Sequence, residues 1–98
     1  MKFTIKVLNE NIITLARKMG YRPLGVNQEK EYSVVRTIGN NNFPRFHIYL
    51  RKSEKTGQFE INLHLDQKKP SYRGTAAHAG EYEGKIIEEE AERIKKIF

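Results

Sequence analysis

The segment that decides the fold spans residues 43–66 and reads FPRFHIYLRKSEKTGQFEINLHLD. In its first half, apolar side chains at positions 46, 48 and 50 alternate with polar ones. In its second half, the apolar positions are 59, 61, 63 and 65. Such alternation is typical of strands with one buried face and one polar face. Because a short loop at 53–57 separates the halves, we predict two neighbouring antiparallel strands, 43–52 and 59–66.

Further strand and turn signals precede this pair. Residues 31–38 (EYSVVRTI) are rich in β-branched and aromatic side chains, which favours a third strand. The turn 39–42 (GNNN) links it to the pair, because Gly and Asn tolerate positive φ. Near the start of the chain, Phe3, Ile5 and Val7 alternate with polar residues and indicate a short, weaker strand.

Two segments have the apolar spacing of amphipathic helices. The first begins after Asn9, a good N-cap, and ends at Gly20, which favours a left-handed stop. The second spans residues 86–98 and carries the i,i+4 pairs Glu89–Arg93 and Glu92–Lys96. We therefore predict an α+β fold in which N- and C-terminal helices flank a three-stranded antiparallel sheet (α-β-β-β-α). The N-terminal strand is an optional addition, and both helices lie on one face of the sheet.

Length and composition indicate one small domain that spans residues 1–98. The chain has no cysteine, which excludes disulfides, thiolate catalysis and cysteine-based zinc sites. No stretch approaches the roughly 20 apolar residues that span a bilayer, and the first six residues lack the apolar core of a signal peptide. We therefore expect a cytoplasmic protein with no membrane partner.

The net charge of +6 is unevenly distributed. Residues 1–80 carry 14 Lys and Arg against 6 Asp and Glu, a balance of +8. Residues 81–98 carry 4 against 6, a balance of −2. A basic body attracts phosphates, so this charge favours a nucleic-acid partner, although many basic domains bind none.

Two histidines share the polar face of the predicted strand pair. In one hairpin register His47 and His64 are directly opposite, and in the alternative register they are diagonal neighbours. Asp66 continues the same face beside His64, while Arg45 and Tyr49 flank His47. We expect this face to be open to solvent, because a small antiparallel sheet commonly buries only one side.

Three kinds of chemistry suit His47, His64 and Asp66. As general acid and base, the imidazoles would suit RNA cleavage, because histidine exchanges protons near neutral pH. As metal ligands, the three side chains would leave an open coordination position. The His-x-Asp spacing is too short to be diagnostic, and we predict no metal and no other cofactor. As contact residues, the His, Tyr and Arg side chains of this face would stack on bases or bond to phosphates. The alternative to all three is a polar strand face without a site.

A long segment, residues 67–84, shows neither helical nor strand periodicity. Loops of this length in small domains are commonly functional or disordered. Its cations and aromatic rings are interleaved, which suits a strand of nucleic acid. We predict that two residues of the strand face and six of this segment bind nucleic acid, namely Arg45, Tyr49, Lys68, Lys69, Tyr72, Arg73, His78 and Tyr82.

The order of elements, together with three local segments, resembles the HicA-type toxins. The likeness is strongest in Leu15–Tyr21, Tyr32–Gly39 and Arg45–Leu50. These small mRNA interferases have a double-stranded-RNA-binding-domain-like fold, and a Gly-Ser-His motif that carries the catalytic histidine opens their second strand. The resemblance implies that His47 is the corresponding residue, with Arg45-Phe46 in place of Gly-Ser.

A second resemblance covers the block 62–72 (NLHLDQKKPSY) together with 78–84 (HAGEYEG). It is similar to a signature of uncharacterised small bacterial proteins and implies no activity. Our leading hypothesis is an RNA-binding module that uses the open sheet face and the 67–84 loop. The alternatives are a HicA-like ribonuclease that uses His47, and a protein-interaction or homodimerisation module. Whether the chain is an enzyme stays open at this point.

Overall fold

The computed structural model describes residues 1–7, 10–67, 80–81 and 84–98. Its helices and strands follow one another as β1 (Lys2–Ile5), α1 (Ile12–Met19), β2 (Arg22–Val26), β3 (Tyr32–Thr37), β4 (Arg45–Lys52), β5 (Phe59–Asp66), β6 (Gly80–Glu81) and α2 (Lys85–Ile97).

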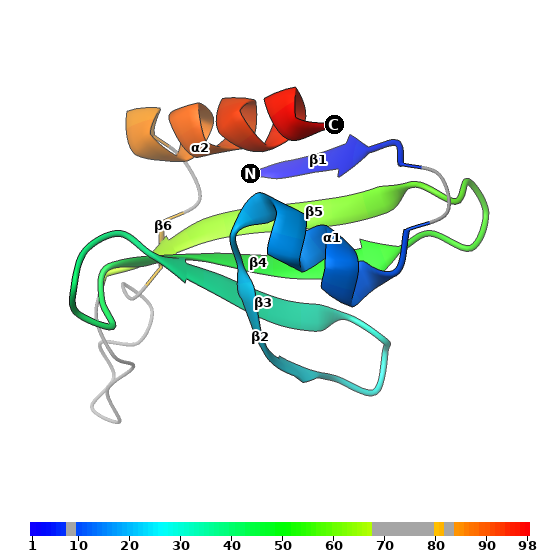
Figure 1. Ribbon diagram of the computed structural model, residues 1–98, viewed down its shortest axis with the longest axis horizontal. Helices are drawn as coiled ribbons and strands as arrows, with labels where there is room; N and C mark the ends of the chain where they lie inside the picture. The colour runs from blue at the N-terminus through cyan, green and yellow to red at the C-terminus, as the bar shows by residue number, and fades with distance from the viewer. Residues whose placement is uncertain (8–9, 68–79, 82–83) are drawn as a thin grey trace.

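The sheet is larger than the sequence predicts. Five antiparallel strands lie in the order β1-β5-β4-β3-β2, and the two-residue β6 also pairs with β5 (Figure 1). The α+β class stands, but the prediction of a three-stranded sheet is wrong. The N-terminal strand is a full member that pairs with β5 through Phe3 and Ile61, and β2 adds an edge that we did not predict.

Strand β2 escapes sequence patterns because it contains two residues that usually break strands, Pro23 and Gly25. Among the described strands it pairs only with β3, so the missing N–H of Pro23 is tolerable at a sheet edge. The register shifts between these residues, which leaves Leu24 without a partner in the ladder. Such a bulge bends the strand and hides its alternation.

The central pair has the register that sets the two histidines directly opposite each other. In the β4–β5 ladder His47 faces His64 and Arg45 faces Asp66. The hairpin loop closes through a hydrogen bond from the amide of Ser53 to the carbonyl of Gln58 at 2.8 Å. The predicted strand pair is thus confirmed, with its first strand beginning two residues later than expected.

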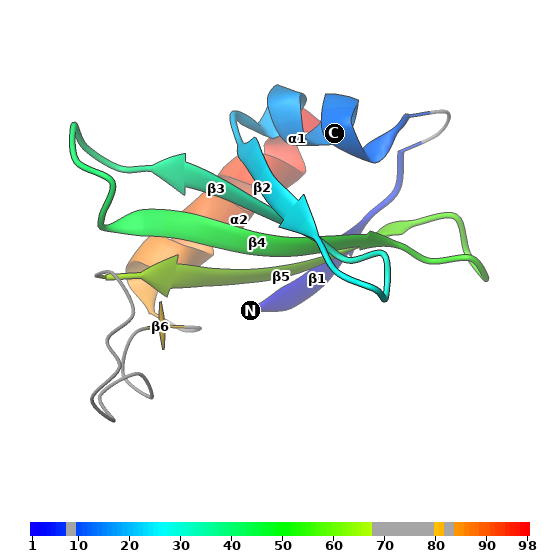
Figure 2. The ribbon, with the colours of Figure 1, turned by 90° about the horizontal axis from the view of Figure 1, so that it is seen from below.

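Both helices lie on the same face of the sheet (Figure 2). Helix α1 is capped by Asn11, whose side chain accepts a hydrogen bond from the amide of Thr14 at 2.8 Å; the predicted cap, Asn9, lies outside the described residues. The helix ends at Gly20 with φ of 86°, as predicted. The described part of the chain contains no helix long and apolar enough to cross a membrane.

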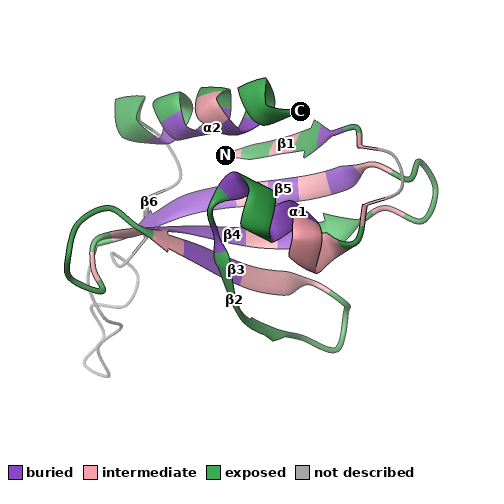
Figure 3. Cartoon of the chain, in the orientation of Figure 1, coloured by how far each residue is buried: buried purple, intermediate pink, exposed green. Residues whose placement is uncertain are grey.

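The hydrophobic core fills the space between the helices and the sheet. Buried residues concentrate in β4 and β5 and on the inner sides of the helices (Figure 3). The fully buried side chains include Leu15, Met19, Ile48, Leu63 and Ile94. Because successive side chains of a strand point to opposite faces, this core turns His47 and His64 away from the helices.

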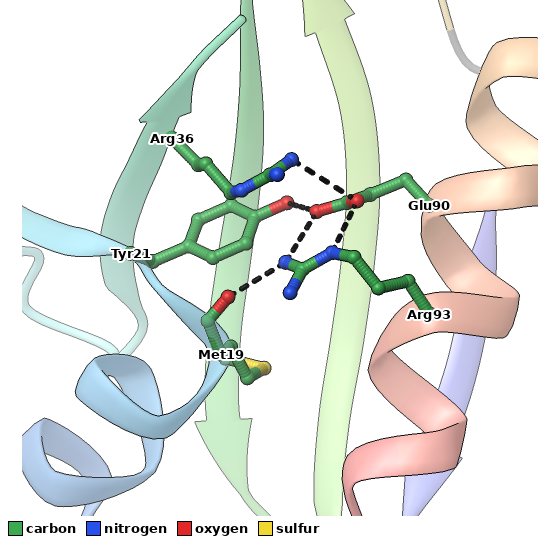
Figure 4. A network of polar contacts seen from close by, with 5 residues as sticks. All are labelled: Met19, Tyr21, Arg36, Glu90 and Arg93. Atoms are coloured by element: carbon green, nitrogen blue, oxygen red, sulfur yellow. Dashed lines mark hydrogen bonds and ion pairs between the residues drawn. The ribbon is translucent and has the colours of Figure 1, made fainter.

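The buried carboxylate of Glu90 links α2 to β3 and to the residue that precedes β2. Glu90, only 4% exposed, accepts hydrogen bonds from Tyr21 Oη at 2.6 Å and from Arg93 Nε at 2.7 Å (Figure 4). Arg36 of β3 reaches the same carboxylate at 3.3 Å, and Arg93 also binds the carbonyl of Met19. The predicted partner of Arg93 was Glu89, which lies instead near Lys85. This network is structural, because each of its groups is turned to another element of the fold.

Candidate functional site

Asp66, the last residue of β5, organises a polar cluster on the face of the sheet opposite α1 and α2, which we call the helix-free face. The cluster consists of Asp66, Arg45, His47, His64 and Ser33. Its Oδ2 atom lies 2.9 Å from His47 Nδ1 and 3.1 Å from Arg45 Nε. Its Oδ1 atom lies 3.0 Å from His64 Nε2. One carboxylate therefore holds three donors that come from two neighbouring strands. The sequence prediction that His47, His64 and Asp66 lie together is confirmed.

The bonds to Asp66 fix the tautomers of both imidazoles. An ionised carboxylate only accepts hydrogen bonds, so each facing ring nitrogen carries its proton. In neutral His47 the proton is therefore on Nδ1, and Nε2 is an acceptor. The Ser33 hydroxyl lies 2.5 Å from that Nε2 and donates to it. Ser33, His47 and Asp66 form a continuous chain of hydrogen bonds across three strands.

The electrostatics of the cluster keep Asp66 ionised. Burial alone would raise the pKa of this carboxyl group. The hydrogen bonds from His47, His64 and Arg45 outweigh burial and hold the pKa of Asp66 well below its usual range. The carboxylate is thus a permanent anion at neutral pH, which suits a group that orients an imidazole and stabilises its protonated form.

The cluster is less accessible than the sequence predicts. His47 is 8% exposed and His64 4% exposed, although both belong to the face opposite α1 and α2. Their ring centroids are 4.6 Å apart, and the Tyr49 ring stacks at 5.4 Å from that of His64. The expectation of a freely solvated histidine face is therefore wrong for these two rings. Because they touch each other, a phosphate cannot lie between them as it would between a separated acid and base.

Ser33 is the residue of this cluster that sequence reasoning missed. It lies on β3 opposite Tyr49, one diagonal step from His47, which pairs with Val35. A serine in a strand carries no pattern that marks it, and only the β3–β4 register brings it to the imidazole. Because side chains two positions apart in a strand share a face, the register places Ser33 on the face of His47.

The residues that could hold a metal are His47, His64 and Asp66. Each offers one donor atom, and these atoms lie within 4.8 Å of one another. In a tetrahedral zinc site, bonds of about 2.0–2.1 Å set ligand atoms roughly 3.3 Å apart, so modest adjustments would suffice. The guanidinium of Arg45 already binds the Asp66 carboxylate, however, and a divalent cation would have to displace this guanidinium. The observed contacts fit an acid–base chain more directly than a metal centre.

Two hollows flank Tyr49 on the same face. One, of about 370 Å³, is lined by polar side chains that include Lys2, Arg51 and Asn62. Among the described residues none donates a hydrogen bond to the buried Oδ1 atom of Asn62. The other hollow, of about 300 Å³, lies toward β2 and is lined partly by Ser33. Arg51 is also paired with Glu60 at 2.6 Å, so the face carries both signs of charge.

The predicted binding residues divide into two groups. Arg45 and Tyr49 lie on the helix-free face, beside the cluster and the hollows respectively. Arg45 also lies over the Phe43 ring at 4.4 Å. The remaining six lie outside the described residues, namely Lys68, Lys69, Tyr72, Arg73, His78 and Tyr82.

Comparisons with known proteins add no functional assignment. No protein-family model matches this chain, and neither a curated protein nor a solved structure matches it. The resemblance to HicA-type toxins therefore stays a prediction that rests on the order of elements and on His47.

Proposed function

We propose that this chain is a cytoplasmic RNA-binding domain that receives single-stranded RNA on the helix-free face of its sheet. The observation that carries the proposal is the 370 Å³ hollow in which Tyr49, Lys2, Arg51 and Asn62 converge. An aromatic ring offers a stacking surface to any base, and cations attract the phosphates.

Burial changes the assignment of roles within this proposal. The imidazoles of His47 and His64 are too enclosed to stack on bases, so Tyr49 replaces them as the contact ring. The cations of residues 68–73 remain proposed phosphate contacts, in keeping with the basic surplus of the chain.

The test is the binding of a fluorescein-labelled single-stranded RNA, followed by fluorescence anisotropy at rising salt. Base–aromatic stacking contributes roughly 1–3 kcal/mol, so Tyr49→Ala should weaken binding about 5- to 160-fold, whereas Tyr49→Phe should preserve it. Lys2→Gln should reduce the salt slope, whereas Lys96→Gln on α2 is the matched control and should not. Absence of any RNA binding by the folded protein at low salt would end this proposal.

The second candidate function is cleavage of the bound RNA with His47 as base, which the HicA resemblance implies. The observation in its favour is the bond from His47 Nδ1 to Asp66, which leaves Nε2 as the basic atom. In this candidate, the RNA 2′-OH would take the place of the Ser33 hydroxyl at Nε2. His47→Ala should then abolish RNA cleavage and leave RNA binding nearly intact, as gel analysis of the products would show.

A protein partner or a homodimer is the third proposal. The free edge of β2 exposes Leu24 and Val26, which gives a partner an apolar contact. Pro23 and the bulge after it oppose strand addition at this edge, however. Light scattering that showed a stable dimer, together with loss of that dimer in Leu24→Ser, would favour this proposal over RNA binding.

A further inference from the structure

We propose that Ser33 is a nucleophile that hydrolyses neutral carboxylic esters, with His47 as its base and Asp66 as the residue that positions His47. The contacts of these three side chains match those of the Ser-His-Asp triad of serine hydrolases. The Ser33 hydroxyl lies 2.5 Å from His47 Nε2, and the opposite nitrogen of that ring lies 2.9 Å from Asp66. A nucleophile, a base and an orienting carboxylate in hydrogen-bonded sequence recur on unrelated folds and are recognised by geometry.

Two further contacts hold Asp66, at one end of the hydrogen-bonded series Ser33–His47–Asp66. Asp66 also binds His64 and Arg45, so it is fixed from three sides. It therefore holds His47 in one tautomer, with Nε2 turned to the hydroxyl. His64 and Arg45 are positioning residues in this proposal and contact no substrate.

Ser33 also lines the 300 Å³ hollow toward β2. Gly25 is the ladder partner of Ser33, and a Cβ atom added at Gly25 would meet nothing within 4 Å. The absence of a side chain there leaves room beside the nucleophile. Leu24 and Val26 line the same hollow and are about half exposed, which suits a short apolar acyl chain.

The lining of the hollow also limits the charge of the substrate. Glu31 is its ionisable acid, and Asn27 and Tyr49 add polar groups. A carboxylate beside the nucleophile repels anions, so we infer a neutral ester rather than a phosphate ester or an acidic one. The bulge at Leu24 places this residue outside the regular β2–β3 pairing at the rim of the hollow.

The reaction balances with water as the second reactant. Ser33 Oγ attacks the ester carbonyl carbon while its proton passes to His47 Nε2. The bond from carbon to the alcohol oxygen then breaks, and His47 returns the proton to the departing alcohol. A water molecule attacks the acyl-serine, again giving a proton to His47, which passes it to Ser33 Oγ as the carboxylic acid leaves.

The experiment uses the whole, untagged chain and a fluorophosphonate probe, which phosphonylates activated serines with loss of fluoride. Mass spectrometry of a digest should find the label on the peptide that contains Ser33. Hydrolysis of p-nitrophenyl acetate should fall at least 100-fold in Ser33→Ala and in His47→Gln. The matched control Ser53→Ala, which removes a loop hydroxyl, should retain both labelling and hydrolysis.

A further variant tests the hollow without touching the hydrogen-bonded chain. Gly25→Leu should slow labelling of Ser33 at least 10-fold by filling the space beside it. Circular dichroism verifies that each variant is folded. Ester hydrolysis that persists in folded Ser33→Ala, or a label on other serines only, would overturn the proposal. The inference does not depend on RNA binding, and RNA cleavage through a 2′-OH would survive Ser33→Ala.

Discussion

His47 and His64 face each other across the β4–β5 pair, and each is bound to a different oxygen of the Asp66 carboxylate. Two imidazoles on adjacent strands could have been independent polar residues. The shared carboxylate makes them one unit, because moving either ring breaks a bond to the anion that also holds the other.

Asp66→Asn should destabilise the fold by about 2–3 kcal/mol. Removing one partner of a buried ion pair costs about 3–5 kcal/mol, and this carboxylate is slightly exposed. Urea denaturation measures the loss. Glu60→Gln is the matched control, because Glu60 is on the same strand and in an exposed pair with Arg51, and it should change stability by less than about 0.5 kcal/mol. Equal losses in both variants would contradict this prediction.

Lowering the pH should reduce the free energy of unfolding through the same carboxylate, that of Asp66. The pKa of Asp66 is lower in the folded state than in the unfolded chain, where it is about 3.9. Its contribution to stability is therefore complete well above pH 4 and falls as the pH drops below that value, since the unfolded state then binds the extra proton. Chemical denaturation between pH 5 and pH 2 should show a steeper decline in the native protein than in Asp66→Asn.

Alkali should act on the opposite side of the sheet, at Tyr21. Burial, reinforced by the bond to Glu90, raises the pKa of Tyr21 above its usual range. Stability from the neutral phenol is complete below about pH 10, the unfolded value, and is lost as the pH rises beyond it. Tyr21→Phe should cost about 1–2 kcal/mol at pH 7 and should flatten this alkaline decline. An identical alkaline slope in both proteins would show that Tyr21 is not responsible.

Zinc should reveal the competition between a cation and Arg45. The guanidinium lies 3.1 Å from Asp66, so Arg45→Ala frees the carboxylate next to two imidazoles. We expect Zn²⁺ to raise the melting temperature of Arg45→Ala more than that of the native protein, because a ligand that binds only the folded state stabilises it. Adding His64→Ala should remove the difference. A larger zinc effect in the native protein would mean that Arg45 assists the metal.

The sequence predicts the central sheet well and its edges poorly. The β-branched and aromatic residues of 31–38 located the strand around Val34, and alternation located those around Ile48 and Leu63, which each have one face in the core. Strand β2 has no such face, since all five of its residues are exposed, and Pro23 and Gly25 resemble loop residues. Its existence depends on pairing with β3, which no local pattern records.

For the candidate site, too, the sequence predicts some features and misses others. Because side chains alternate between the two faces of a strand, the sequence placed His47, His64 and Asp66 on one face, which the register confirms. Their burial was not predictable, because it depends on neighbours such as Tyr49 that pack over the rings. The contact between Ser33 and His47 depends on the β3–β4 register, which the segment 31–38 does not specify because it lacks a clear apolar alternation.

The position of β1 has a consequence for the order in which the fold assembles. Strands β3, β4 and β5 are consecutive in the chain and can zip together locally, whereas β1 joins β5 through residues such as Met1 and Leu63, 62 positions apart. Closing so long a span is entropically costly, so contacts of this kind form late. We expect the amides of β1 to be the first in the sheet to exchange with deuterium, and the central meander to be protected longest.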